Sequence, residues 1–144
     1  MSGALLRRLL VPIATKADAE KTIPTLMDYV DGETSELHVV HVIEKAGGAP
    51  DKAPLEARQE QAEKIFSFVE RFVGDRIDVT TELRYGTDIV DEIIASAEES
   101  DVTAIAFVPR PSGRIPKILT GDTTRRLVAN EQIPVLVLPG GDNH

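Results

Sequence analysis

The stretch that decides the fold is residues 102–139, VTAIAFVPRPSGRIPKILTGDTTRRLVANEQIPVLVLP. Its first apolar segment, residues 102–108, predicts a buried strand. A basic loop with three prolines follows, and the pair Gly121-Asp122 then predicts a short helix over residues 122–130, with Asp122 as its N-cap. A second apolar strand is predicted at residues 135–138. A strand, a helix and a second strand in this order predict a parallel pair joined by a crossover.

The rest of the chain repeats this alternation of strands and helices. In the segment around residues 55–73 the apolar residues fall on one helical stripe, on which we place Phe72. The turn Gly86-Thr87-Asp88 supplies an N-cap for the next helix. The remaining predicted strands are residues 5–14, 37–43 and 77–83, and the predicted helices are residues 16–30, 55–73 and 89–99. Five strands and four helices predict a single-domain α/β fold, a three-layer α/β/α sandwich around a parallel sheet.

The net charge and the lengths of the apolar runs exclude several classes of function. Asp and Glu outnumber Lys and Arg by 24 to 16, which gives a net charge of −8 and argues against binding nucleic acid or an anionic membrane. This acidity fits either a high-salt cytoplasm or ordinary solubility. No apolar run approaches the roughly 18 residues of a membrane span, and the first residues lack the parts of a signal peptide. We therefore expect a cytoplasmic protein.

Metal and thiol chemistry find no support in the sequence. The chain has no cysteine, which excludes disulfides and cysteine ligands. His38 and His41 are three residues apart in a predicted strand, so their side chains should point to opposite faces. We expect no metal site and interpret both as structural histidines.

Five segments, in order, resemble the universal stress protein family along almost the whole chain. They are LLVPIAT, LHVVHVIE, Tyr85-Gly86 before DIVDEIIASAEES, VTAIAFVP, and TGDTTRRLVANEQIPVLVLP. The resemblance implies an adenine-nucleotide α-hydrolase-like fold over residues 1–139, with strand order 3-2-1-4-5. It also implies a homodimer formed through the last strand. Residues 140–144 are expected to be a disordered tail.

The same resemblance places a nucleotide site and shows that most of its motif is replaced. ATP-binding members carry Gly-x2-Gly-x9-Gly-Ser/Thr, whose glycines let backbone N–H groups approach the phosphates. Anchored on Gly121, the motif positions here hold Val108, Pro111 and Asp122. The family's aspartate after the first strand is replaced by Ala14. The positions that correspond to the family's nucleotide site are Ala14, Thr15, Val42, Val108, Arg110, Pro111, Gly121, Asp122 and Thr123.

Two interpretations of the basic loop stay open. Arg110, Arg114 and Lys117 could hold a phosphate or nucleotide in an altered way, or they could pair with nearby acids in a solvated loop. We expect no cofactor, with ATP or AMP as the alternative. The last strand also has two interpretations, because its apolar residues lie at a sheet edge. Pairing with a second copy would cover Val135, Leu136, Val137 and Leu138, as would the protein's own helices.

Enzyme motifs are absent from the sequence. It contains no Gly-x-Ser-x-Gly elbow, no His-Glu-x-x-His and no Walker-type loop. The acidic residues and the lysine of a phospho-receiver domain are also missing from the strand ends. Two hypotheses remain: a non-catalytic dimeric stress-response module with unknown protein partners, and a nucleotide-binding stress protein with a rewritten loop. A weak ATPase activity is left open.

Overall fold

Five parallel strands form one sheet in the order β3-β2-β1-β4-β5. The structure is a computed structural model that describes residues 5–30, 32, 34–45, 52–109 and 121–139. The strands are β1 (Arg8–Pro12), β2 (Glu36–Glu44), β3 (Asp78–Gly86), β4 (Ala104–Phe107) and β5 (Val135–Val137). The predicted α/β class and the strand order are both confirmed.

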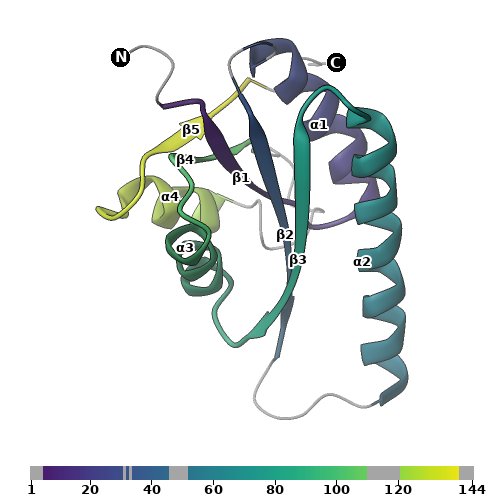
Figure 1. The fold of residues 1–144 in the computed structure, drawn as a ribbon. Helices are drawn as coiled ribbons and strands as arrows, with labels where there is room; N and C mark the ends of the chain where they lie inside the picture. Colours follow the sequence, from purple (N-terminus) through teal and green to yellow (C-terminus); the bar gives the residue numbers. More distant parts are fainter. Residues whose placement is uncertain (1–4, 31, 33, 46–51, 110–120, 140–144) are drawn as a thin grey trace.

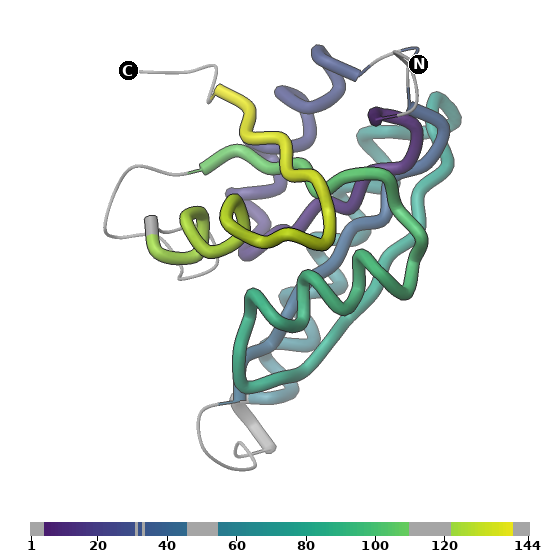
Figure 2. Tube along the Cα trace, turned by 90° about the vertical axis from the view of Figure 1, so that its left-hand side faces the viewer, coloured from purple at the N-terminus to yellow at the C-terminus, as the bar shows by residue number. Residues whose placement is uncertain are grey.

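Four helices cover the two faces of this sheet. They are α1 (Lys16–Val30), α2 (Lys52–Val73), α3 (Ile89–Glu99) and α4 (Gly121–Ala129). The helices α1 and α2 lie on one side of the sheet, and α3 and α4 lie on the other (Figure 1; Figure 2 looks onto the side of α3 and α4). None of the helices in the described residues is long and apolar enough to cross a membrane.

The core has two layers because alternate residues of a strand point to opposite faces of the sheet. In β1, Leu9 and Val11 pack with α1 and α2, whereas Leu10 packs with Val90 and Ile93 of α3. Both layers are fully buried at their centres, since the exposed fraction is 0% for Leu9, Leu10, Val11 and Ile93. The central strands are therefore apolar on both sides, as expected for a parallel sheet between helices.

Four local expectations need correction. The first strand is shorter than residues 5–14, and α2 begins at Lys52 rather than at residue 55. Proline is tolerated in a first helical turn because the N–H it lacks has no helical partner there, so Pro54 does not block this start. Phe72 is 39% exposed instead of buried, beside the ring of Phe68 and beneath the Arg76 guanidinium. Because α4 begins at Gly121, Asp122 lies inside its first turn and is not its N-cap.

Candidate functional site

A cavity lies at the carboxyl edge of the sheet, where ligands of open α/β folds bind. It has a volume of about 210 Å³ and lies between the end of β2, the β3–α3 turn and the first turns of α3 and α4. Most of its polar lining groups are carboxylates and hydroxyls. The lining residues are Glu44, Thr87, Asp88, Ile89, Val90, Asp122, Thr123 and Arg126.

Asp88 connects the two helices of this cavity. Its Oδ1 accepts a hydrogen bond from the Asp91 N–H at 3.0 Å, which makes it the N-cap of α3, as predicted. Its Oδ2 lies 3.1 Å from a guanidinium nitrogen of Arg126 in α4. The hydrogen bond from the Asp91 N–H and the Arg126 charge hold the pKa of Asp88 below its usual range. The only guanidinium among the described lining residues is thus engaged by a lining carboxylate.

The turn between β1 and α1 is closed by a buried aspartate. Asp18 is 2% exposed, and its Oδ2 accepts a hydrogen bond from the Ala14 N–H at 2.9 Å. Its Oδ1 accepts from the Thr22 hydroxyl at 3.0 Å, and its own N–H donates to Thr15 Oγ1 at 3.0 Å. This reciprocal arrangement, which we call the capping box, has Thr15 as the N-cap of α1, and Asp18 reaches back one residue beyond that cap, to the Ala14 N–H.

The structure brings together only part of the predicted nucleotide site. Asp122 and Thr123 line the cavity, and Gly121 is the first residue of α4. Arg110 and Pro111 lie outside the described residues. The remaining predicted positions do not line the cavity: Thr15 is half-buried, and Ala14, Val42 and Val108 are 9%, 6% and 2% exposed.

Sequence reasoning missed Glu44 and Arg126. Ligands of open α/β folds bind beyond the carboxyl ends of the strands, and this rule could have found Glu44, the last residue of β2. Arg126 follows Asp122 by four residues, a spacing that puts both on one face of α4. The described lining therefore carries three carboxylates, Glu44, Asp88 and Asp122, against one guanidinium. In the described residues, no group of three or more His, Cys, Asp or Glu side chains could hold a metal ion.

The two histidines point to opposite faces of the sheet, as predicted, and both are hydrogen-bonded. His41 lies on the side of α2, and its Nδ1 atom is 2.8 Å from the Ile13 carbonyl oxygen. Burial, helped by the Arg58 charge, lowers the pKa of His41 despite this hydrogen bond. His38 faces α3 and contacts Thr80, Glu82 and Ser100.

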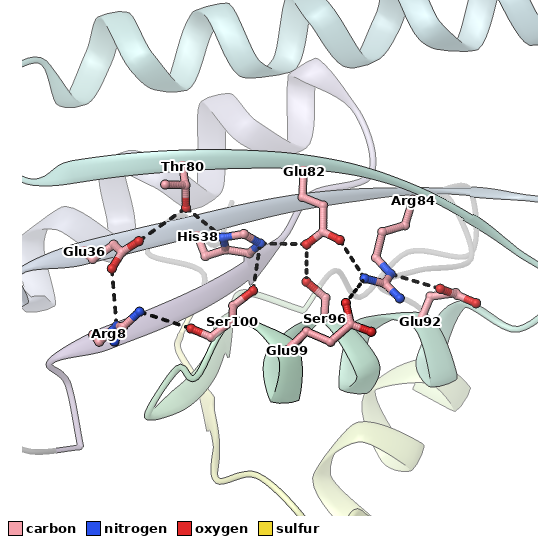
Figure 3. Close-up of polar contacts among 10 residues, drawn as sticks. All are labelled: Arg8, Glu36, His38, Thr80, Glu82, Arg84, Glu92, Ser96, Glu99 and Ser100. Carbon is pink, nitrogen blue, oxygen red and sulfur yellow. Dashed lines mark hydrogen bonds and ion pairs between the residues drawn. The ribbon is translucent and has the colours of Figure 1, made fainter.

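A continuous polar layer joins α3 to the outer half of the sheet, and Figure 3 shows it. Arg84 of β3 contacts three carboxylates, those of Glu82, Glu92 and Glu99, at 2.6, 2.9 and 3.0 Å. The hydrogen bond that Arg84 donates to Glu99, together with those it donates to Glu82 and Glu92, raises the pKa of Arg84 above its usual range. Elsewhere α3 packs through apolar residues, so this layer fixes the helix at the β3 side of the sheet. Its members are Arg8, Glu36, His38, Thr80, Glu82, Arg84, Glu92, Ser96, Glu99 and Ser100.

The last strand leaves an apolar strip at the opposite edge. Val137 is 44% exposed and Val128 of α4 is 53% exposed. Val135, Leu136 and Leu138 are half-buried. Leu136 and Leu138 pack against the core on the side of α1 and α2. The protein's own helices thus cover this strand only in part.

Comparison with known proteins identifies the scaffold. A universal stress protein from Burkholderia pseudomallei matches with a TM-score of 0.71 and 16% identity, covering 94% of this chain and 98% of that one. A universal stress protein from Archaeoglobus fulgidus in complex with dAMP matches with a TM-score of 0.65 and 19% identity, covering 93% and 98%. A family protein from Arabidopsis thaliana with AMP bound matches with a TM-score of 0.62 and 13% identity, covering 92% and 91%. At these identities the likeness shows the fold alone.

No curated protein matches the chain. The model of the universal stress protein family matches residues 6–139, which is nearly the whole described chain. The chain therefore belongs to the universal stress protein family.

Proposed function

We propose that this protein is a non-catalytic, dimeric regulatory module of the stress response that does not bind ATP in the family's usual mode. The observation that carries the proposal is the charge of the ligand edge. A triphosphate brought there would meet the carboxylates of Glu44, Asp88 and Asp122. The opposing guanidinium, Arg126, already pairs with Asp88. Like charges about 4 Å apart repel by about 1 kcal/mol even in water, which weakens binding several-fold for each pair.

Two backbone positions that correspond to the family's nucleotide site offer no free donor. The N–H of Ala14, the residue at the place of the family's aspartate, is taken by the buried carboxylate of Asp18. Pro111 has no N–H at all. A nucleotide would have to displace an internal hydrogen bond at one of these positions and do without a donor at the other.

The strip on β5 supports the dimer. An exposed apolar edge strand favours association, and pairing two copies along β5 would bury Val137 together with Val128. Of the carboxylates that line the ligand edge, Asp88 serves as a cap and pairs with Arg126, and Asp122 pairs with Arg125. Action through protein partners is the simpler function.

The second candidate is a nucleotide-binding member with a rewritten loop. It is favoured by two fold neighbours whose structures hold dAMP and AMP. It would use the cations Arg110, Arg114 and Lys117, which lie outside the described residues.

Titration calorimetry with ATP and with AMP, at low and high salt, separates the two candidates. The proposal predicts absent binding or a Kd of about 1 mM or weaker, whereas a Kd below ~50 µM would overturn it. Asp122→Ser restores the family's hydroxyl and removes a charge, so it should tighten ATP binding several-fold. The matched control, Asp91→Ser, changes an exposed carboxylate of α3 outside the cavity lining and should leave binding unchanged.

A further inference from the structure

Three side chains of the polar layer form a nucleophile, a base and an orienting acid, away from the ligand edge. Thr80 Oγ1 lies 2.7 Å from His38 Nδ1, and His38 Nε2 lies 2.7 Å from Glu82 Oε1 (Figure 3). The sheet register enforces this geometry, because His38 of β2 pairs directly with Thr80 of β3. Thr80 and Glu82 are two residues apart on one strand, so they share a face of the sheet.

The hydrogen-bond partners of His38 determine which of its two ring nitrogens carries a proton. Burial would raise the pKa of Glu82, but hydrogen bonds from Ser96, His38 and Arg84 hold it below its usual range, so this carboxylate is ionised and can only accept. The Nε2 of His38 therefore carries a proton, and Ser100 Oγ lies 3.2 Å from the same nitrogen. In the neutral ring, Nδ1 is then the acceptor for the Thr80 hydroxyl. A hydroxyl that donates to an oriented imidazole is an activated nucleophile.

The hydroxyl can be reached from solvent. Thr80 is exposed on β3, an edge strand of the sheet, whereas the side chains of His38 and Glu82 are 14% and 27% exposed. The base and the orienting acid are thus held in the layer while the nucleophile faces outward.

The surrounding charges select the kind of reagent. Glu36 Oε2 lies 3.5 Å from Thr80 Oγ1, and Glu82 lies on the far side of the imidazole. Glu36 is balanced by Arg8, whose Nε lies 3.3 Å away, and Arg8 also donates to the Ser100 carbonyl. Further along, Arg84 is shared by Glu82, Glu92 and Glu99. With carboxylates closest to the hydroxyl, an anionic donor would be repelled and an uncharged one accepted.

We propose that Thr80 is a self-acylation site that reacts with uncharged activated esters, with His38 as its general base. The Thr80 oxygen attacks the acyl carbon while its proton passes to His38 Nδ1. The bond between that carbon and the leaving oxygen then breaks, and the leaving oxygen takes the proton from Nδ1. The products are a threonine ester and a free alcohol or phenol. Glu82 acts as a positioning residue that fixes the tautomer of His38.

The expected size of the effect is that of general base catalysis alone. A positioned base contributes about 10²–10⁴-fold to such a step. Thr80 in the folded protein should therefore react at least about 100-fold faster than the same threonine in the chain unfolded in urea. The ester should accumulate to one equivalent, because Thr80 is the hydroxyl at the basic Nδ1 of His38, whereas the Ser100 hydroxyl lies at Nε2, which carries a proton and cannot act as a base.

The experiment uses p-nitrophenyl acetate and follows the acetyl group by intact mass and peptide mapping. Thr80→Val keeps the shape of the side chain and should abolish the label. Thr81→Val, the next residue on the strand and on the other face, should retain it. His38→Gln should slow acetylation of Thr80 at least tenfold. Glu82→Gln, whose amide oxygen can still accept from His38 Nε2, should keep more of the rate than Glu82→Ala, a rescue that points to a positioning role.

Circular dichroism and urea unfolding of each variant show that the variant is folded. Labels confined to lysines or the amino terminus would overturn the proposal. So would equal rates at Thr80 in the wild type and His38→Gln, or in the folded and urea-unfolded wild-type chain.

Discussion

Replacing Arg84 with methionine tests whether the polar layer stabilises the fold. The guanidinium side chain is 16% exposed, and the carboxylates of Glu82 and Glu92 are each 27% exposed. Arg84→Met keeps much of the apolar stem but leaves these two half-buried carboxylates without their cation. Removing one partner of such a pair is costly because the other charge stays desolvated.

The magnitude follows from the exposure of each pair. The pairs with Glu82 and Glu92 are each worth roughly 1–1.5 kcal/mol, between the values for surface and buried pairs. Glu99 is 66% exposed, so solvent screens its pair with Arg84 to a few tenths of a kcal/mol. We expect Arg84→Met to lower the free energy of unfolding by about 3 kcal/mol at pH 7.

The stability difference between Arg84→Met and the wild type should change with pH in a defined direction. The pKa of Glu82 is depressed from 4.5 in the folded protein, so its stabilising contribution is complete above pH 4.5 and is lost as the pH falls through the folded value. In Arg84→Met, Glu82 has lost the hydrogen bond and the charge of Arg84, both of which lower its pKa, so it protonates more readily than in the wild type. The difference between variant and wild type should therefore narrow as the pH falls from 7 to about 4.

Urea unfolding at several pH values measures this difference. Arg71→Met, an exposed position on α2, serves as the control and should change stability by less than about 0.5 kcal/mol. In a Glu82→Gln background, Arg84→Met should cost only about half as much, because one of the two strong pairs is already gone. A loss below about 1 kcal/mol, or one that does not vary with pH, would refute the reasoning.

Three further predictions concern other parts of the molecule. Val137→Lys should convert the proposed β5 dimer to a folded monomer, measured by light scattering and circular dichroism, since Val137 is 44% exposed. A dimer that persists in this variant would place the interface elsewhere. Asp18→Ala should cost about 3 kcal/mol in urea unfolding, because the Ala14 N–H and the Thr22 hydroxyl lose their acceptor; a cost within error would contradict the capping box. The pKa of His41 in the folded protein lies below 6.5, so the stability of the wild type should fall as the pH drops below 6.5. His41→Gln should reduce this dependence of stability on pH between about pH 6.5 and 5, and an equal dependence in both proteins would contradict the assignment.

The fold could be predicted because its signals are local and repeated. Apolar runs in the strands and the 3.6-residue stripes of the helices gave nine elements in the right order, and α1 spans residues 16–30 in both the prediction and the structure. Errors fell where local signals are weak. Phe72 is exposed although Val69 and Val73 of the same helix are buried in the core, so it lies outside the buried part of the apolar stripe, which periodicity alone does not reveal.

The candidate site was predicted less well because it depends on contacts between distant residues. The pair of Asp88 and Arg126 joins residues 38 positions apart, and no spacing in the sequence signals it. The resemblance led to Val42 and Val108, which the structure buries in the core. The polar layer was equally invisible, since the strand containing Thr80, Glu82 and Arg84 reads as an ordinary half-exposed strand.

The capping box at Asp18 has a consequence for how the cell could control this protein. Where a ligand supplies the hydrogen bonds of a loop, folding and ligand concentration are linked, and the folded population follows the supply of ligand. Here the chain supplies those bonds itself at the β1–α1 turn. Under the proposed function, the stability of that turn would be independent of the nucleotide pool. The proposed association along β5 would then vary with the abundance of the protein, so synthesis and degradation would set its state.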